Sequence, residues 1–489
     1  MIAWLPDLLY TGGRFERGLA LVCEATGQIA SIIRADELRE EKRIRLANRA
    51  MLPGMVNAHS HAFQRVLRGR TEYRTGNQDS FWTWREMMYS AATRLTPDDV
   101  YDASRMAFLE MVVGGITAVG EFHYLHHAPD GASYDDPNLL AKEAVRAASD
   151  VGLRIALLRV AYARAGFQTE PNPKQARFIE SDAESYLRNL EKLISDLSES
   201  GGRLPSVPAN HSASTWVGVA PHSVRAVPLE YLREVIGQAK QRDLKVHMHV
   251  AEQPAEVSAC VEEHGRTPVA LLETEGLLDE NFTAVHAIHV TPKAIPAFAR
   301  TGAMVCACPT TERNLGDGVV PADEYMKHDV PICLGTDSHA QIDLLEDARE
   351  LEYHLRLQRL QRAVLSVRSA NLSERNSGDK ALPHERASDA AGFLFDCATV
   401  NGARSIGAPG GALEPGRPAD FFTVALDDPS IAGASSDDLV ASIVFAASRA
   451  AVREVVVGGK PIVSEGQHLI QEEVVERFND LQKRLWSWG

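Results

Sequence analysis

The chain has 489 residues, of which 45% are hydrophobic and 24% charged, a composition typical of a globular protein with one large core and a smaller unit. Its formal net charge of -15 argues against nucleic acid or an anionic membrane as a partner of the surface as a whole. Six cysteines without paired spacing, no apolar run near the ~18 residues of a membrane span, and no secretion signal together predict a cytoplasmic protein.

Short strands are predicted at both ends of the chain. They lie near the N-terminus at residues 8–10, 18–23, 29–33 and 43–50, and near the C-terminus at residues 420–425, 443–445 and 452–457. A terminal helix is predicted over residues 472–485. Because two β-rich ends can pair, residues 1–50 and 405–489 are predicted to form a small β-sandwich domain with a C-terminal helix.

Between these ends, apolar strand-like runs alternate with helical stretches. The strands are predicted at residues 51–58, 116–122, 153–160, 216–220, 244–250, 283–286, 303–307 and 330–335. Helices are predicted at residues 97–113, 139–150, 181–197, 229–242, 267–275 and 292–301. Eight β/α units indicate a (β/α)8 TIM-like barrel over residues 51–404, with its chemistry at the C-terminal ends of the strands.

Several stretches interrupt this alternation. Loops are predicted where Gly, Pro, Asn, Asp and Ser are frequent, at residues 129–138, 166–177, 201–214 and 366–382. Helices are predicted on both sides of the last loop, over residues 344–365 and 385–403. Cys306 and Cys308 lie in an apolar run, where we expect them to pack inside a strand.

Two histidines, His59 and His61, end the first barrel strand in the run LPGMVNAHSH. On an extended strand they share a face with Cα atoms about 6.5 Å apart, so both imidazoles can reach one metal ion at ~2.1 Å. An isolated His-x-His pair is more often two polar residues at the surface end of a strand. Its interpretation as half of a metal site therefore depends on the rest of the chain.

Three further strand ends carry residues of the ligand type. Strand five reads LKVHMHVAE, where His249 is followed by Glu252, a carboxylate able to move protons beside a metal ion. Strand six contributes His286 and strand eight contributes Asp337. Each residue alone is explained by an ordinary structural role, but four such strand ends together indicate a metal centre in the barrel mouth. We expect structural roles for three neighbouring histidines: His247, His289 and His339.

The order of these residues resembles the amidohydrolase superfamily, and within it the mononuclear deaminase branch. The opening LPGMVNAHSH and the late segment GALEPGRPADF are both typical of the superfamily. Six further segments resemble the formimidoylglutamate deiminase family: HAFQR, DSFWTWREMMY, EFHYLHH, APHSVRAV, AEQ and NLGDG. The resemblance implies hydrolysis of N-formimino-L-glutamate to N-formyl-L-glutamate and ammonia, in histidine degradation.

Both the resemblance and the donor chemistry assign roles to the strand-end residues. One divalent ion, expected to be Zn²⁺, would be held by His59, His61, His249 and Asp337, although such ligands also accept iron or manganese. The ion lowers the pKa of water toward ~7 for attack on the formimino carbon. We expect Glu252 to carry a proton from that water or from Asp337 to the departing nitrogen, and His286 to orient the attacking oxygen or stabilise developing charge.

The small-molecule substrate implied by the resemblance is an amidine with two carboxylates, so its site is expected to present fixed cations. Arg85, in a WTWRE segment expected to be a loop, and Arg225, in PHSVR, are predicted to overhang the barrel mouth and pair with carboxylates. The resemblance implies further substrate contacts from Gln64, Tyr124 and His222. It also implies a homodimer.

Other functions stay open at this point. A deaminase of guanine, adenosine-type or thiomethyl nucleosides would share the metal site but would need a pocket for a flat ring. A chlorohydrolase or amide hydrolase of the same superfamily is a second alternative, and a non-catalytic barrel is an alternative from a different class. Metal content and ammonia release separate an enzyme from a scaffold, and a panel of formimino and purine substrates separates the enzymes.

Overall fold

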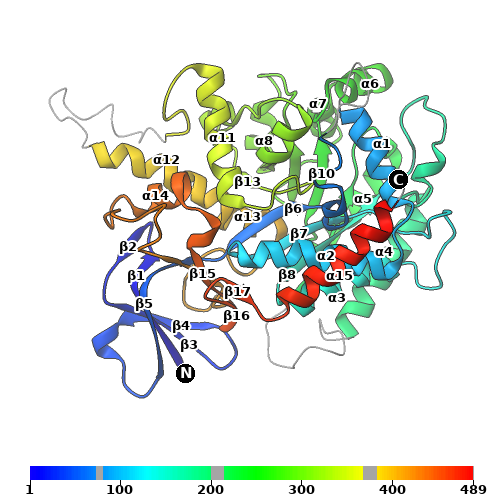
Figure 1. Ribbon diagram of the computed structural model, residues 1–489. Helices are drawn as coiled ribbons and strands as arrows, with labels where there is room; N and C mark the ends of the chain where they lie inside the picture. The colour runs from blue at the N-terminus through cyan, green and yellow to red at the C-terminus, as the bar shows by residue number, and fades with distance from the viewer. Residues whose placement is uncertain (73–80, 200–213, 367–382, 488–489) are drawn as a thin grey trace, which may run out of the picture.

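Two sheets organise the computed structural model, which describes residues 1–72, 81–199, 214–366 and 383–487 (Figure 1). One is an eight-stranded parallel barrel, and the other is a nine-stranded mixed sheet built from both ends of the chain. This architecture confirms the predicted fold class. The loops predicted at residues 201–214 and 366–382 lie, apart from residues 214 and 366, outside the described residues.

The barrel strands follow one another in chain order around the sheet. They are β6 (Met55–Ser60), β7 (Ile116–His123), β8 (Arg154–Ala161), β9 (Thr215–Pro221), β10 (Val246–Val250), β11 (Phe282–His286), β12 (Met304–Ala307) and β13 (Ile332–Leu334). The barrel closes beyond β13, where the backbone N–H of Asp337 donates to the His59 oxygen (3.0 Å) and that of His61 to the Asp337 oxygen (3.1 Å). Closure therefore joins residues predicted to bind one metal ion.

The first predicted barrel strand, residues 51–58, is divided between the two sheets. Strand β5 (Lys42–Pro53) belongs to the mixed sheet and β6 to the barrel, with Gly54 between them. A Cβ atom at Gly54 would lie 2.2 Å from Oγ1 of Thr117 on β7, so only glycine lets the backbone pass there. The strand pattern in the sequence runs across this junction because both halves are buried.

Helices surround the barrel (Figure 1). They are α2 (Pro97–Val113), α3 (Leu139–Val151), α4 (Ala183–Glu199), α5 (Leu229–Gln241), α6 (Pro254–His264), α7 (Pro268–Thr274), α8 (Ile295–Thr301), α9 (Pro309–Leu315), α10 (Ala322–Lys327), α11 (Leu344–Arg359), α12 (Pro383–Ala398) and α13 (Val400–Ile406). Helix α2 begins at a reciprocal cap, in which Thr96 and Asp99 each accept the other's backbone N–H. This cap explains why its predicted start is correct.

The mixed sheet interleaves the two ends of the chain. Its order is β17 (Gln467–His468), β16 (Lys460–Ser464), β15 (Val452–Val457), β14 (Phe421–Ala425), β5, β1 (Ile2–Thr11), β3 (Leu19–Cys23) and β4 (Ile29–Arg34), with β2 (Arg14–Glu16) paired to β1. The late strand β14 runs antiparallel to β5. Trp4 and Phe421, from opposite ends, pack edge to face with ring centroids 5.2 Å apart.

Three predicted elements are wrong in type or extent. The strand predicted at 443–445 is part of helix α14 (Leu439–Ala446), which buries Leu439, Val440, Ile443 and Val444 on one face. The helix predicted over 344–365 ends at Arg359, because Leu360 adopts φ of +53°. The helix predicted over 385–403 is broken at Thr399, where φ is −129° and ψ −91°. Tertiary packing and single backbone angles decided all three outcomes.

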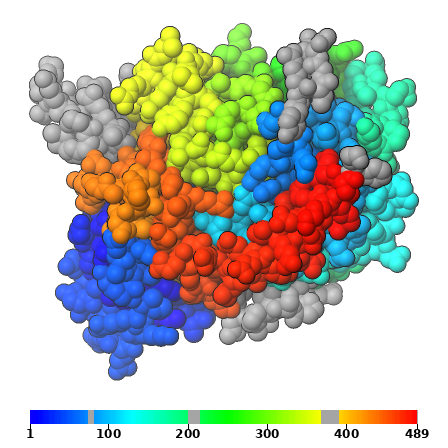
Figure 2. Space-filling view, viewed as in Figure 1, coloured from blue at the N-terminus to red at the C-terminus, as the bar shows by residue number. Residues whose placement is uncertain are grey.

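The C-terminal helix α15 (Gln471–Trp486) packs antiparallel on barrel helix α2. It buries Val474, Phe478, Leu481 and Leu485, and Figure 2 shows its outer face (red) on the molecular surface. Ion pairs also join the two helices: Arg105–Glu473 (2.7 Å), Asp102–Arg477 (2.7 Å) and Asp99–Arg484. None of the helices in the described part of the chain is long and apolar enough to cross a membrane.

Candidate metal centre and active site

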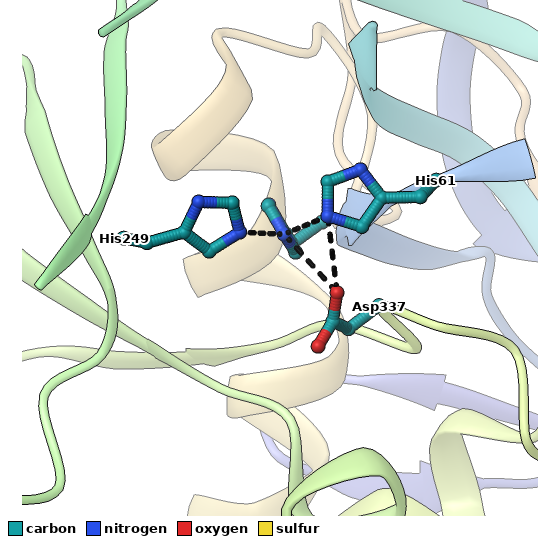
Figure 3. Close-up of side chains that lie close together, drawn as sticks. His61, His249 and Asp337 are labelled. Carbon is teal, nitrogen blue, oxygen red and sulfur yellow. Dashed lines mark hydrogen bonds and ion pairs between the residues drawn. The ribbon is translucent and has the colours of Figure 1, made fainter. Parts of the chain in front are cut away.

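Four side chains predicted as metal ligands converge at the C-terminal mouth of the barrel. His59 Nε2 lies 3.2 Å from Nε2 of His61 and 3.2 Å from Nε2 of His249. Asp337 Oδ1 lies 3.1 Å from His61 Nε2 and 3.5 Å from His59 Nε2. Figure 3 shows His61, His249 and Asp337 pointing toward one another. All four ligand atoms lie within 4.8 Å of each other, and all four side chains are buried.

Hydrogen bonds set which ring nitrogens face the centre. Nδ1 of His61 lies 3.0 Å from the backbone oxygen of Phe122, and Nδ1 of His249 lies 3.0 Å from that of His222. A carbonyl oxygen only accepts, so each Nδ1 carries the proton and each Nε2 presents a lone pair. Lone pairs this close repel unless a cation lies between them. The donor set of three imidazoles and one carboxylate therefore fits a divalent metal ion.

A second group of charges lies beside these ligands. His286 Nε2 is 3.7 Å from Glu252 Oε1 and 3.7 Å from Asp337 Oδ2, while its Nδ1 is 3.2 Å from Glu312 Oε1. Burial acts to lower the pKa of His286, but Glu252 and the other carboxylates raise it to about 10. Burial and the nearby Asp337 charge raise the pKa of Glu252, despite the opposing effect of His286. Glu312, on helix α9, was not predicted as a site residue.

Left-handed backbone angles mark the strand ends that carry these side chains. φ is +52° at Ala251, +67° at His286, +49° at Ala287, +45° at Asp337 and +59° at His339. Such angles are strained for residues with a Cβ atom and are found where the surrounding structure fixes a side chain for function. Strain at the ends of β10, β11 and β13 supports their assignment as the site.

A buried polar network links the first and last strands beneath the ligands. His339 contacts the Ser60 hydroxyl (3.0 Å) and the Thr336 hydroxyl (3.1 Å), and Ser60 donates to Glu121 Oε2 (2.6 Å). Asn57 donates to the Thr336 hydroxyl (2.7 Å). Burial raises the pKa of Glu121 to about 7. Because His59 and His61 flank Ser60 in the chain, this network holds the strand that carries them.

The other two histidines expected to be structural contact backbone oxygens. His247 Nε2 lies 3.2 Å from the oxygen of Ser405, and His289 Nε2 lies 2.8 Å from that of Asp317. Both contacts point away from the four metal-ligand atoms. They agree with the expected structural roles.

A small cavity of about 50 Å³ opens above the metal-ligand group. Nine of its lining residues were predicted as site residues: His61, Gln64, Arg85, Tyr124, His222, Arg225, His249, Glu252 and Asp337. His59 and His286 lie deeper and are fully buried. The structure thus brings all the predicted site residues together.

Arg85 lies on helix α1 (Phe81–Ala92), so the prediction of a loop for its segment is wrong. Its guanidinium lies over the Trp82 ring, 4.4 Å from the centroid, and its buried Nε and Nη1 have no hydrogen-bond partner among the described residues. Arg225 donates through Nη1 to the Ala165 oxygen (2.9 Å). Two guanidinium groups on one cavity wall create a positive region within an acidic protein.

The sequence reasoning missed two tyrosines of the cavity wall, Tyr89 and Tyr162, and the glutamine that binds both of them. Gln175 donates through Nε2 to the hydroxyls of Tyr89 and Tyr162, each at 2.7 Å. Burial raises the pKa of Tyr89, so this tyrosine keeps its hydroxyl form near neutral pH. Gln175 lies in a stretch rich in Gly and Pro, and no local pattern marks it. Tyr89 ends the WTWREMMY run, which offered an aromatic signal.

Similar proteins place this geometry in a family. Residues 50–462 match the model of the amidohydrolase family. A formimidoylglutamate deiminase of Pseudomonas aeruginosa is 38% identical over 88% of each chain. A 5-methylthioadenosine/S-adenosylhomocysteine deaminase of Haloarcula marismortui is 27% identical over 97% of this chain and 95% of its own.

Among solved structures, an amidohydrolase from Brucella melitensis superposes with a TM-score of 0.85. It is 32% identical, and the match covers 99% of this chain and 100% of that one. The full-length match includes both sheets, and the family match includes every residue of the metal-ligand group. The chain therefore belongs to the amidohydrolase family.

Proposed function

We propose that this protein is a metal-dependent formimidoylglutamate deiminase, which hydrolyses N-formimino-L-glutamate to N-formyl-L-glutamate and ammonia. The observation that carries the proposal is the pair of arginines, Arg85 and Arg225, in the same cavity as the metal-ligand group. A dicarboxylate amidine needs such cations, whereas a purine does not. The relative from Pseudomonas aeruginosa supports the same activity. Histidine degradation in the cytoplasm is the setting we propose.

His59, His61, His249 and Asp337 would hold one divalent ion, and we propose Zn²⁺ because imidazole and carboxylate are ligands it favours. When bound, the ion acts as a Lewis acid that lowers the pKa of water. Asp337 Oδ2, which faces His286, is left to accept a proton. The pKa of Asp337 lies well below its usual range, since its contacts with the imidazoles of His59 and His61 outweigh the effect of burial.

We propose that Glu252 moves the proton. It lines the cavity, and its raised pKa makes it a better proton acceptor than an exposed glutamate. Deimination moves both protons of the water to the departing nitrogen. Glu252 takes the first from the attacking water and delivers it, and the second passes through Asp337 as the C–N bond breaks and ammonia leaves. His286, kept protonated by Glu312 and Glu252, donates from Nε2 to the oxygen added to the formimino carbon.

Substrate orientation is assigned to the cavity wall. The unpartnered Nε and Nη1 of Arg85 can receive one carboxylate, and Arg225 the other. Gln64 donates to the Tyr124 hydroxyl (2.6 Å), and its buried Oε1 has no partner among the described residues. That oxygen can accept an N–H of the amidine. His222, whose pKa burial and Arg225 hold well below its usual range, stays neutral beside it.

Ammonia release by metal-replete protein tests the proposal. N-formimino-L-glutamate is expected to be turned over, and 5-methylthioadenosine, S-adenosylhomocysteine and guanine are not. Protein with Glu252→Gln serves as the matched control for contaminating deaminase. Turnover of a purine or nucleoside in preference to N-formimino-L-glutamate would transfer the assignment to the activity named for the Haloarcula marismortui relative. We also propose a homodimer, which light scattering of the purified protein measures.

A further inference from the structure

A second set of potential metal ligands lies beside the first. One ring nitrogen of His286, the sulfur of Cys308 and one carboxylate oxygen of Asp337 lie within 4.8 Å of one another, and all three residues are buried. Cys308 was expected to pack inside a strand, but it lies beyond the end of β12 as the N-terminal cap residue of α9. Its thiol is therefore at the same end of the barrel as the metal-ligand group.

An unsatisfied nitrogen points into this second group. His286 is fully buried, and its Nε2 has no hydrogen-bond partner among the described residues. Its Nδ1 is already engaged by Glu312, so Nε2 is the atom left for a ligand. Asp337 Oδ2 and Glu252 Oε1 each lie 3.7 Å from Nε2, which is too far for a hydrogen bond but leaves room for an ion between these atoms.

The charge around His286 also favours a cation. Four carboxyl groups surround it, namely Glu252, Glu312, Asp317 and Asp337. Asp317 is held by Gln253, and its Oδ2 has no hydrogen-bond partner among the described residues. Burial and the Glu252 charge raise the pKa of Asp317 to about 9, a sign of excess negative charge.

Asp337 can serve both sites at once. Its Oδ1 faces His59 and His61, and its Oδ2 faces His286. We propose that His286, Cys308 and Asp337, with Glu252 in reach, form a second site for a thiophilic divalent cation such as Zn²⁺ or Cd²⁺. Sulfur together with imidazole and carboxylate selects such ions over Mg²⁺ or Ca²⁺. Binding releases the proton of the Cys308 thiol and the proton that His286 carries on Nε2, and both pass to the solvent.

Filling this site is expected to stop deimination. An ion on His286 Nε2 occupies the atom that donates to the reacting oxygen, and it also engages the Asp337 oxygen left to accept a proton. The second site is therefore inhibitory. Its binding is independent of the proposed function, whereas the inhibition rests on it.

Metal binding without substrate tests the site itself. Protein loaded with one equivalent of Zn²⁺ is titrated with Cd²⁺, and the thiolate-to-metal charge-transfer band is recorded with the bound stoichiometry from equilibrium dialysis. Wild type is expected to bind a second ion with the band. Cys308→Ser is expected to lose the band and to weaken the second binding by at least ~10-fold, as even outer-shell changes at metal sites do.

Two further variants serve as controls for the Cys308→Ser binding measurement. Cys333→Ser changes a buried cysteine that lies outside the group and is expected to keep the band. Cys308→Ala adds no polar atom to the buried site and replaces the serine variant if that protein does not fold. A single ion per chain, or equal second binding in wild type and both Cys308 variants, overturns the site.

Inhibition is then measured separately. Excess Zn²⁺ is expected to inhibit ammonia release by wild type, and Cys308→Ser is expected to need at least ~10-fold more Zn²⁺ for the same inhibition. Equal inhibition of both proteins overturns the inhibitory role. Absence of any ammonia release from the one-equivalent enzyme would instead contradict the proposed function, while leaving the binding result intact.

Discussion

Glu252 and Asp337 are carboxyl groups in one cavity whose pKa values are moved in opposite directions. Burial and the Asp337 charge raise the pKa of Glu252, whereas for Asp337 the contacts with the imidazoles of His59 and His61 overcome burial and lower it. One carboxyl group can therefore hold a proton at the pH at which the other stays ionised. Pairs of this kind divide acid–base and ligand roles between similar side chains.

Replacing Glu252 tests this division. Glu252→Gln keeps the size of the side chain and lies outside the metal-ligand group, so we expect full metal content and an unchanged fold. Loss of the proton carrier is expected to lower kcat by at least ~10²-fold. Asp337→Ala is expected to lower kcat as much or more and to lose some metal. Turnover close to wild type in the glutamine variant would remove Glu252 from the mechanism.

The two cavity arginines make a second prediction. Removing Arg85 or Arg225 leaves one substrate carboxylate unpaired, and the loss in kcat/KM is expected to be roughly 2–4 kcal/mol at unchanged metal content. Replacing one substrate carboxylate by an amide is expected to lower the kcat/KM of wild type by a similar amount. The same replacement is expected to lower the kcat/KM of the matching arginine variant much less. A double cycle across enzyme and substrate measures this coupling. Additive losses would mean that the arginines do not contact the carboxylates.

The site residues that could be predicted from the sequence are those whose positions follow from the geometry of a single strand. His59 and His61 alternate on a strand, and His249 precedes Glu252 at a strand end, so their approach follows from strand geometry. Glu312 contacts the site from the short helix α9, and Gln175 from a single 3-10 turn at Pro173–Gln175. No period in the sequence fixes where such side chains point, and only the folded structure shows it.

Elements around the barrel are joined by buried polar contacts as well as apolar packing. Arg159 on β8 pairs with Glu180 just before α4, with contacts of 2.5 and 2.9 Å, and also donates to Asn138 at the start of α3 (2.9 Å). Asn189 on α4 donates to Glu180 Oε1 (2.6 Å). The network fixes two helices against one strand.

The contribution of the Arg159–Glu180 network to the free energy of unfolding is expected to depend on pH. Burial acts to raise the pKa of Glu180, but His126, Arg159 and their neighbours outweigh it and lower the value from 4.5 to about 2. A lowered folded-state pKa stabilises the protein above pH 4.5, by about 3 kcal/mol, and that stability is lost as the pH falls toward 2. Urea unfolding of wild type and Glu180→Gln between pH 7 and 2 measures it. The difference in unfolding free energy is expected to shrink as the pH falls, and a constant difference would contradict the ionic role.

The prediction of elements from the sequence failed where tertiary contacts decide. Ile443, Val444 and Phe445 are typical strand residues, yet they lie in a helix because Leu439, Val440, Ile443 and Val444 together cover α11 and α12. Residues 385–403 have one continuous helical pattern, and the break occurs at Thr399, whose hydroxyl donates to the Phe395 oxygen (2.7 Å). The barrel strands were predicted well because strands buried on both faces form continuous apolar runs.

On the scale of the whole molecule, the C-terminal helix α15 closes one side of the barrel by resting on α2. The contact has a buried apolar centre and ion pairs that are partly exposed to solvent. Such pairs contribute little, about 0–1 kcal/mol each, whereas a buried aromatic ring contributes several times more.

Two substitutions on α15 separate these contributions. Phe478→Ala is expected to lower the unfolding free energy by about 3 kcal/mol, because it leaves a cavity against α2. Arg477→Ala, one residue earlier, is expected to lower it by less than about 1 kcal/mol, since 45% of the arginine side chain is exposed. Denaturant unfolding of the metal-loaded proteins measures both. Equal losses would mean that charge, and not apolar packing, holds α15.

The pairing of β5 with β14 has a consequence for synthesis of the protein on the ribosome. Strand β5 is complete at residue 53, but its partner begins only at residue 421. At translation rates on the order of 5–20 residues per second, one edge of the N-terminal sheet stays open for tens of seconds while the barrel is made. An open edge is a template for strands of other chains. Chains released early, for example at residue 419, are therefore expected to sediment as aggregates, while full-length chains made in parallel stay in the supernatant.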